Sequence, residues 1–260
     1  MRAILKDVKN YVLYYGPGRE DELSIFDLVI VESGWHNKDS LKRIKQRNSL
    51  ILAYMSALEV IPGSALEKRA SACDYLRING KNAINEEYGN FIMDPRSSNW
   101  RKIITEDANK LVREGYDGIF LDTLGIVEDK RLSGALSQEL LLSTAHLVGR
   151  IRRHLPDAII VQNSGMGNLY ELTARTVNGF CWENPSLPFS TWSYNKAGVL
   201  KEIQDKYGTR IMILLQSEEP PDVALKNFQS VYSLASQCNF LVYISPGDYT
   251  SGIFPMLPNF

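Results

Sequence analysis

The sequence contains few cysteines, and their number and spacing exclude two kinds of site. The number is odd and no two cysteines form a CxxC pair, so neither a disulfide framework nor a zinc site is indicated. The three cysteines are Cys73, Cys181 and Cys238. Histidines are equally scarce, and the three present are too scattered to suggest a metal site. We therefore expect no metal and no cofactor.

Long apolar runs and an excess of charge of one sign are also missing. No apolar stretch reaches the roughly 18–20 residues that span a bilayer. The net charge is −1, from 29 basic and 30 acidic residues, and no basic run offers a surface for a phosphate backbone. We expect a monomer that binds neither nucleic acid nor a membrane.

The first residues lack the apolar core of roughly 7–15 residues that a signal peptide requires. Lysines and an aspartate interrupt the opening segment MRAILKDVKN. The location of the protein stays open on this ground. The protein is either cytoplasmic, or it is extracellular or periplasmic and has lost an export signal that preceded residue 1.

Eight short apolar runs, rich in β-branched and aromatic residues, alternate with stretches of helical pattern. Near-continuous apolar strands argue for a parallel sheet covered on both faces, and eight such units favour a closed (β/α)8 barrel. The length of 260 residues suits one such barrel, so we predict a single domain over residues 1–260. The predicted strands are residues 11–15, 27–32, 50–56, 118–122, 158–162, 179–183, 210–215 and 240–245.

Helices are predicted between these strands from apolar residues at helical spacing. One covers residues 98–114 and ends before Gly115, and another covers residues 137–154 and ends before Pro156. Pro220 and Pro221 suit the first turn of the helix before the last strand.

Two irregularities depart from the regular barrel. Residues 59–94 form a long insertion after the third strand, with a predicted helix near residues 65–76. Such an insertion lies at the rim where barrels build active sites. Too few residues follow the eighth strand for a full eighth helix. We therefore expect an outer helix ring that is incomplete or is closed by the N-terminal segment.

Two carboxylates stand at the ends of predicted strands, where barrels of this kind place the residues that act on substrate. Asp122 ends the fourth strand and Glu183 the sixth, each directly after an apolar run (GIFL and GFCW). Alternation along a strand puts Asp122 on the face of Phe120 and Glu183 on the face of Cys181. If those faces line the barrel interior, both carboxylates point into its mouth as a catalytic pair.

Such a pair suits glycoside hydrolysis, in which one carboxylate is ionised as nucleophile or base and the other is protonated as acid. The GxSxG, GxxxxGKS/T and HExxH motifs of other mechanisms are absent. Aromatic residues near the strand ends suit stacking on sugar faces, although packing at the bases of the loops explains them equally well. These residues are Tyr14, Tyr15, Trp35, Trp192, Tyr194 and Tyr249.

Further polar side chains follow other strands, and we take four of them as substrate-binding candidates. Tyr14 lies at the end of the first strand, Asn163 after the fifth, Gln216 after the seventh and Asp248 after the eighth. For Asp248, a role as the N-cap of a helix explains the residue equally well.

The segments that hold these residues resemble a known family. The runs ILAYMSALE, GYDGIFLDTL, IIVQNSG and GFCWENP, in this order, resemble glycoside hydrolase family 114, the endo-α-1,4-polygalactosaminidases. The resemblance covers essentially the whole chain. Its most specific pieces are GYDGIFLDT and the glutamate that ends the sixth strand.

The resemblance implies a (β/α)8 barrel that cleaves a polymer of partly deacetylated galactosamine without a cofactor. It implies Asp122 as nucleophile and Glu183 as acid/base of a retaining mechanism, and Glu32, Glu59 and Asp94 as substrate-binding residues. Deacetylated galactosamine is cationic, and an acidic cleft would attract it. The expected partner is therefore a polysaccharide or oligosaccharide substrate.

Two alternatives remain open. One is a non-catalytic carbohydrate-binding barrel, in which the two carboxylates would lie far apart or one would be locked by an arginine. The other is a barrel enzyme of small phosphorylated metabolites, with Gly165 and Gly167 in NSGMGN as a weak echo of a phosphate loop. Barrels often bind phosphate in the loops after strands seven and eight, and here Glu218 and Glu219 would repel it.

Overall fold

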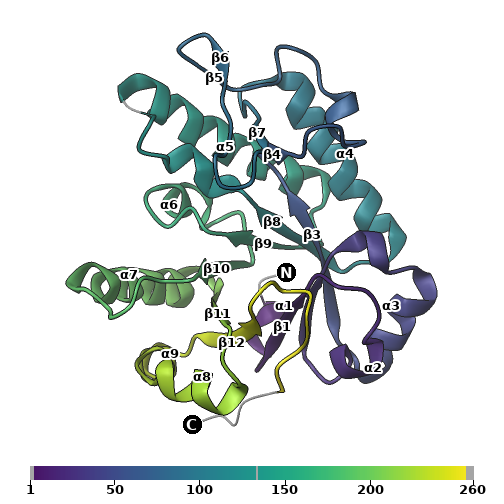
Figure 1. Ribbon diagram of the computed structural model, residues 1–260, viewed down its shortest axis with the longest axis vertical. Coiled ribbons are helices and arrows are strands. Elements are labelled where there is room, and N and C mark those ends of the chain that lie inside the picture. Colours follow the sequence, from purple (N-terminus) through teal and green to yellow (C-terminus); the bar gives the residue numbers. More distant parts are fainter. Residues whose placement is uncertain (1–2, 133, 256–260) are drawn as a thin grey trace.

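A computed structural model describes residues 3–132 and 134–255 of the chain. Its main sheet has eight strands, each parallel to its neighbours, which curl into the barrel that the sequence predicts (Figure 1). The order in the sheet follows the chain: β1 (Tyr11–Tyr14), β2 (Leu28–Val31), β3 (Leu50–Ser56), β8 (Gly118–Asp122), β9 (Ile159–Asn163), β10 (Gly179–Glu183), β11 (Arg210–Ser217) and β12 (Leu241–Pro246).

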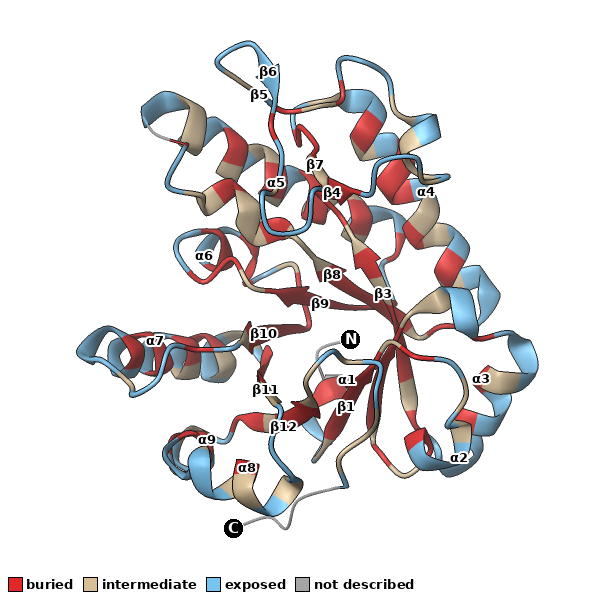
Figure 2. Cartoon of the chain, in the orientation of Figure 1, coloured by how far each residue is buried: buried red, intermediate tan, exposed pale blue. Residues whose placement is uncertain are grey.

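The helices surround these strands and turn their buried sides toward them (Figure 2). No helix in the described ranges combines the length and apolar character of a membrane span. The helices are α1 (Ala3–Lys6), α2 (Glu20–Leu23), α3 (Lys38–Ile44), α4 (Ser98–Glu114), α5 (Gly134–His154), α6 (Leu169–Thr173), α7 (Thr191–Tyr207), α8 (Pro221–Asn227) and α9 (Gln229–Cys238), with 3-10 turns η1 (Ser33–Trp35), η2 (Lys45–Arg47), η3 (Glu67–Arg69) and η4 (Leu124–Glu128).

The predicted helix over residues 98–114 is confirmed to the residue, and the side chain of Ser97 caps its N-terminus. Gly115 ends it with φ of 113°, a conformation that favours glycine. The second predicted helix begins three residues earlier than expected, at Gly134. Pro221 opens α8 as predicted, and α9 continues toward the last strand.

The barrel interior is filled by side chains that alternate along the strands. Tyr11 is fully buried there and its hydroxyl donates to the backbone oxygen of Ile213 across the barrel, over 2.7 Å. Its ring lies 5.8 Å from that of Tyr243. Cys181 is buried in the same layer, directly below Glu183 in the alternation of β10. The floor of the mouth is therefore closed and apolar.

The insertion after β3 covers part of the strand ends. β4 (Glu59–Val60) pairs antiparallel with β7 (Phe91–Ile92), and β5 (Arg77–Ile78) pairs with β6 (Lys81–Asn82). In Figure 1 these short strands lie above β3 and β8, beside α4 and α5. The insertion therefore lies at the rim, as its position in the sequence predicts.

The predicted helix near residues 65–76 is wrong, because this stretch holds only the single turn η3. Asp74 explains the difference. Its buried carboxylate accepts hydrogen bonds from the backbone and hydroxyl of Ser71 and from the side chains of Ser97 and Asn99. These bonds stabilise a turn that ties the insertion to the start of α4, and they compete with helical hydrogen bonding.

No helix follows β12 within the residues described, so the outer ring is incomplete there. The N-terminal segment does not replace the missing helix. Leu5 is fully buried against Gly179, and Arg210 donates to the backbone oxygen of Val8 over 3.1 Å. Gly179 and Arg210 begin β10 and β11, so the N-terminal segment closes the end of the barrel opposite to the mouth.

Candidate active site

Asp122 and Glu183 end β8 and β10, and β9 lies between these two strands. Asn163 ends β9, and its side-chain nitrogen donates to Asp122 Oδ1 over 2.8 Å and to Glu183 Oε2 over 2.6 Å. These two oxygens are therefore no farther apart than the two hydrogen bonds laid end to end. The predicted pairing of the carboxylates is present in the structure.

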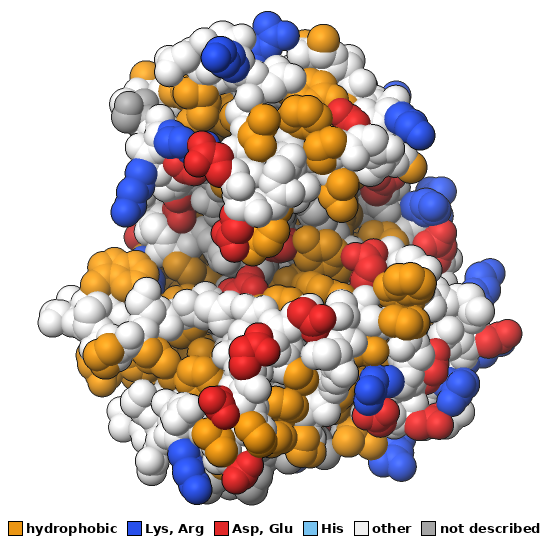
Figure 3. Space-filling view, viewed as in Figure 1, with side chains coloured by type: hydrophobic (Ala, Val, Ile, Leu, Met, Phe, Trp, Pro, Cys, Tyr) orange, Lys and Arg blue, Asp and Glu red, His pale blue; other side chains and the backbone are white. Residues whose placement is uncertain are grey.

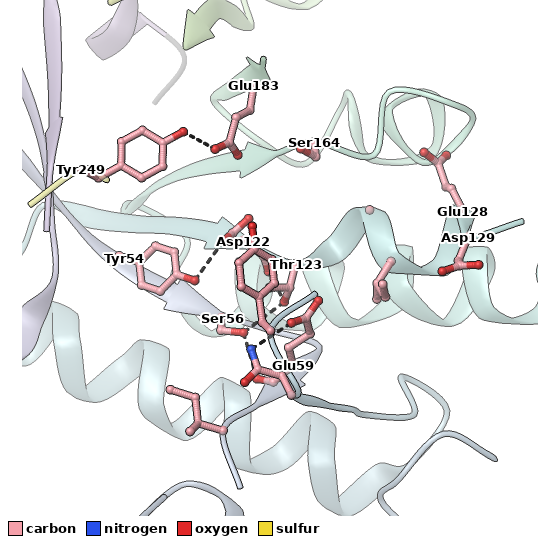
Figure 4. Close-up of a pocket in the computed structure, with 15 residues that line it drawn as sticks. Tyr54, Ser56, Glu59, Asp122, Thr123, Glu128, Asp129, Ser164, Glu183 and Tyr249 are labelled. Carbon is pink, nitrogen blue, oxygen red and sulfur yellow. Dashed lines mark hydrogen bonds between the residues drawn. The ribbon is translucent and has the colours of Figure 1, made fainter. Parts of the chain in front are cut away.

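Each carboxylate also accepts a hydrogen bond from a tyrosine. Tyr54, on β3, donates to Asp122 Oδ2 over 2.9 Å, and Tyr249, after β12, donates to Glu183 Oε1 (Figure 4). The ring of Tyr15 lies between the two, 4.7 Å from that of Tyr54 and 5.6 Å from that of Tyr249. The three rings form one wall behind the pair.

Burial raises the pKa of Glu183 above its ordinary value. The hydrogen bonds from Tyr249 and Asn163 lower the pKa in turn, and the charge of Asp122 raises it. The net direction is upward, so Glu183 keeps its proton to higher pH than an exposed glutamate. Burial also raises the pKa values of Tyr54 and Tyr249, which therefore remain protonated donors. Glu183 is thus suited to act as an acid.

Four non-glycine residues with positive φ surround the pair, three of them directly after the strand-end residues. They are Thr123 (64°), Ser164 (56°), Asn184 (41°) and Tyr249 (63°). For the β-branched Thr123 this conformation is costly. It is compensated by the Thr123 hydroxyl, which accepts from the backbone of Ala57 over 3.1 Å and of Leu58 over 2.8 Å. The backbone strain therefore lies where the loops leave the strands that hold the carboxylate pair.

A cavity of about 630 Å³ opens above the pair. Figure 3 shows the mouth as a groove with acidic side chains along it. Among the described residues that line it, five are carboxylates and none is a lysine or arginine. The lining consists of Tyr54, Ser56, Glu59, Ile61, Tyr88, Asn90, Asp122, Thr123, Gly125, Ile126, Glu128, Asp129, Ser164, Glu183 and Tyr249. The cavity is suited to a ligand with positive charge.

Two more of the predicted acidic residues lie near this cavity. Glu59 lines it, but both of its oxygens already accept hydrogen bonds, from Asn85 over 2.8 Å and from Asn90 over 3.1 Å. Glu32 is half-buried at the end of β2, close enough to Tyr54 for its charge to raise the pKa of that phenol. Burial also raises the pKa of Glu32 itself.

The structure does not bring Tyr14 and Asp94 to the cavity. Tyr14 is buried on the opposite face of β1 from Tyr15, and its hydroxyl donates to the backbone oxygen of Pro17. Asp94 is buried and paired with Arg96, whose Nη2 lies 2.8 Å from Oδ2. Tyr15 packs behind the pair, between Tyr54 and Tyr249, without lining the cavity, and Asp94 has a structural contact instead of a position in the cleft.

Gln216 and Asp248 hold the loops at the mouth without lining the cavity. Gln216 and Asn184 exchange two hydrogen bonds, of 2.7 and 3.0 Å, and Gln216 also donates to the backbone oxygen of Gly247. The exposed Asp248 accepts from the backbone nitrogens of Thr250 and Ser251. These bonds fix the turn that presents Tyr249.

Among the lining residues that sequence reasoning missed, Tyr54 could have been found from the sequence and Tyr88 could not. Tyr54 is two residues before Ser56 on β3, so strand alternation alone puts both side chains on the same face. Tyr88 belongs to an irregular part of the insertion, where no periodic pattern places a side chain.

The second glycine of NSGMGN lies against a carboxylate of the protein itself. The carboxylate of Glu128 accepts from the backbone nitrogens of Gly167 (2.8 Å), Asn168 (2.5 Å) and Leu169 (2.8 Å). A Cβ atom on Gly167 would lie 2.8 Å from this carboxylate, which explains the glycine. Glu128 thus occupies the position that a phosphate would need. No cluster suited to a metal ion occurs in the described part of the chain.

Comparison with known proteins gives one family and a set of similar folds. The sequence profile of glycoside-hydrolase family GH114 matches residues 7–183. No curated protein sequence matches the chain.

Among solved structures, the glycoside hydrolase domain of PelA from Pseudomonas aeruginosa is similar with a TM-score of 0.70 at 19% identity, over 93% of this chain and 96% of that one. Aspergillus fumigatus Ega3, in complex with galactosamine, has a TM-score of 0.72 at 12% identity, over 95% and 94%. The α-galactosidase TtGalA from Thermus thermophilus has a TM-score of 0.60 at 15% identity, over 91% and 55%. At these identities the similarity establishes the fold.

Proposed function

Because the chain belongs to glycoside-hydrolase family GH114, we propose that it cleaves α-1,4-linked, galactosamine-rich polysaccharide at internal bonds. Asp122 is the nucleophile and Glu183 is the acid/base in this proposal. The similar fold of Ega3, whose structure contains galactosamine, supports the choice of sugar.

The shared hydrogen-bond donor Asn163 is the observation on which the mechanism rests. Retaining glycosidases hold their carboxyl groups roughly 5–5.5 Å apart, and inverting enzymes roughly 6.5–9.5 Å. The bonds of 2.8 and 2.6 Å from one nitrogen hold Asp122 Oδ1 and Glu183 Oε2 close together, which supports the shorter, retaining separation. A retaining mechanism therefore fits this pair.

In the first step Asp122 attacks the anomeric carbon while Glu183 gives its proton to the departing glycosidic oxygen. The product is a covalent glycosyl-enzyme. In the second step the ionised Glu183 takes a proton from water, which attacks the anomeric carbon and releases Asp122. The raised pKa of Glu183 favours its role as the acid, and Tyr54 and Asn163 stabilise the charge of the Asp122 nucleophile.

The acidic lining of the cavity supports a cationic substrate over a neutral one. Five carboxylates, and no basic side chain of the described chain, line the space. Deacetylated galactosamine is an ammonium ion near neutral pH, so a deacetylated stretch is attracted where an acetylated one is not. Cleavage should therefore be faster on deacetylated polymer.

The test compares cleavage of deacetylated and acetylated galactosamine polymers by wild type, Asp122→Asn and Glu183→Gln, with products sized by chromatography. Both variants should lose cleavage by at least about a thousandfold while keeping the wild-type melting temperature within a few degrees. Asp157→Asn and Glu202→Gln, which change exposed carboxylates outside the cavity, serve as matched controls and should keep full activity. Full activity in either catalytic variant would overturn the assignment.

The two roles are separated with azide and a galactosaminide that has an activated leaving group. A Glu183→Ala variant should still form the glycosyl-enzyme, which azide then attacks to give a glycosyl azide of retained configuration. Asp122→Ala lacks the nucleophile, so azide attacks the substrate directly and gives the inverted product. If Asp122→Ala gave the retained azide and Glu183→Ala the inverted one, Glu183 would be the nucleophile and Asp122 the acid/base.

A further inference from the structure

A compact turn of the insertion stands over the cavity. An antiparallel bridge between Ile84 and Phe91 closes its base, and the backbone nitrogen of Asn85 donates to the oxygen of Asn90 over 2.9 Å. The nitrogen of Gly89 donates back to Asn85 over 2.8 Å, with φ of 71° at this glycine. Residues 85–90 are therefore folded in one shape by their own backbone.

Two anchors fix the turn to the barrel. The carboxylate of Glu59, which is only 7% exposed, accepts from the side chains of both Asn85 and Asn90. On the other side Arg131 donates to the backbone oxygen of Ile84 over 3.2 Å while it pairs with Asp129. Since both oxygens of Glu59 are used, this residue holds the turn and is poorly placed to bind a sugar.

Tyr88 lies in this turn, between Glu87 and Gly89, and has no role in the core. Its side chain is 67% exposed, although it is a large aromatic residue, and it lines the same cavity as Glu183 and Tyr249. A hydrogen bond to Glu87 and partial burial raise the pKa of its phenol, and the charges of Glu183 and Glu59 add to this effect. Tyr88 is therefore within electrostatic range of the catalytic acid.

We propose that Tyr88 is a substrate-binding residue that stacks on a sugar unit close to the glycosidic bond being cleaved. In this proposal Glu59 is the positioning residue that holds Tyr88 there. The proposal rests on the proposed function and extends it to a residue outside the barrel strands. An aromatic face fits the apolar face of a hexose ring and attracts the ammonium group of an amino sugar. A rigid turn supplies this face without an ordering cost at binding.

Binding is measured by titration calorimetry with deacetylated galactosamine oligosaccharides on the Asp122→Asn protein, which does not consume them. Adding Tyr88→Ala should weaken binding about tenfold, and Tyr88→Trp should keep it within about threefold. Tyr207→Ala is the matched control, because Tyr207 is a partly exposed tyrosine at the end of α7 that does not line the cavity. Unchanged affinity in the Tyr88→Ala protein overturns the proposal.

Kinetics on the active enzyme test the role of Glu59. Tyr88→Ala and Glu59→Gln should each raise KM with little change in kcat, and the double variant should be no worse than Tyr88→Ala alone, since both changes remove the same contact. Additive effects on KM, or a loss of kcat in Glu59→Gln without a change in KM, contradict a positioning role.

The proposed function and this inference fail in distinguishable ways. If wild type cleaves the polymer and Tyr88→Ala binds it normally, only the inference falls. If the oligosaccharide binds in a Tyr88-dependent way and wild type does not cleave, the sugar-binding role of Tyr88 stands and the proposed function falls. Absence of any binding to wild type and Asp122→Asn overturns the inference as well.

Discussion

The side-chain nitrogen of Asn163 lies 2.6 Å from Glu183 Oε2, and the same nitrogen donates to Asp122. This residue was predicted to bind substrate, but its side chain is buried and touches both members of the pair. Asn163→Ala should therefore lower kcat about 10–100-fold, in the range typical for residues that orient catalytic groups, with a smaller change in KM. Steady-state kinetics and circular dichroism on the same preparation check this. A rise in KM at unchanged kcat would return Asn163 to the role of a substrate ligand.

Tyr249 sets the pH dependence through Glu183. The hydroxyl of Tyr249 lowers the pKa of Glu183, so Tyr249→Phe should raise that pKa further above its ordinary value. The proposed mechanism needs the acid form of Glu183 in its first step, so kcat/KM should fall as pH rises through the pKa of Glu183. The alkaline limb of the profile should thus move to higher pH in the variant. Tyr194→Phe is the control, and a shift toward lower pH would contradict the assignment of Glu183 as acid.

The ionised form of Glu183 should also lower the free energy of unfolding at neutral pH. Burial raises its folded pKa above the unfolded value, so the folded state binds its proton more tightly. The corresponding stabilisation is complete below the unfolded pKa of about 4.3 and is lost as pH rises through the folded pKa. Glu183→Gln, which is always neutral, should therefore melt at higher temperature than wild type at pH 7. The difference should shrink toward pH 4, and scanning calorimetry at both pH values decides it.

Asp94 provides the opposite case, a carboxylate that matters for the fold. It is buried and paired with Arg96, which in turn reaches Glu139. Asp94→Ala should lower the free energy of unfolding by about 1–2 kcal/mol, since Arg96 is partly exposed and solvent screens the pair. Urea denaturation measures the loss, and KM should stay at its wild-type value. A raised KM at unchanged stability would show that Asp94 contacts substrate after all.

The barrel was predictable because its strands are apolar on both faces. The runs GIFLD and GFCWE end on their carboxylates in the sequence and in the structure, so periodicity alone located Asp122 and Glu183 at strand ends. The first strand shows the limit of this reasoning. Tyr14 and Tyr15 are adjacent, and a choice between them depends on which face is the interior, which follows only from the pairing of β1 with β2.

The conformation of the insertion, unlike its place at the rim, was not predictable from the sequence. Its conformation depends on side-chain hydrogen bonds between residues far apart in the chain, such as Asp74 with Asn99 and Glu59 with Asn90. Such contacts leave no periodic signal. These contacts stabilise a turn where the sequence predicts a helix, and they hold the segment that carries Tyr88 over the cavity.

The barrel has a seam, because no ladder of hydrogen bonds joins β1 to β12 among the described residues. Tyr249 lies on this seam. Its backbone oxygen accepts from the nitrogen of Tyr15 over 2.8 Å, and its hydroxyl donates to Glu183. A widening of the seam that carries Tyr249 away would leave Glu183 a stronger base, whereas Asp122, held from β3 and β9, would keep its contacts. The proton affinity of Glu183 would thus depend, through one side chain, on how closely the two edges of the barrel meet.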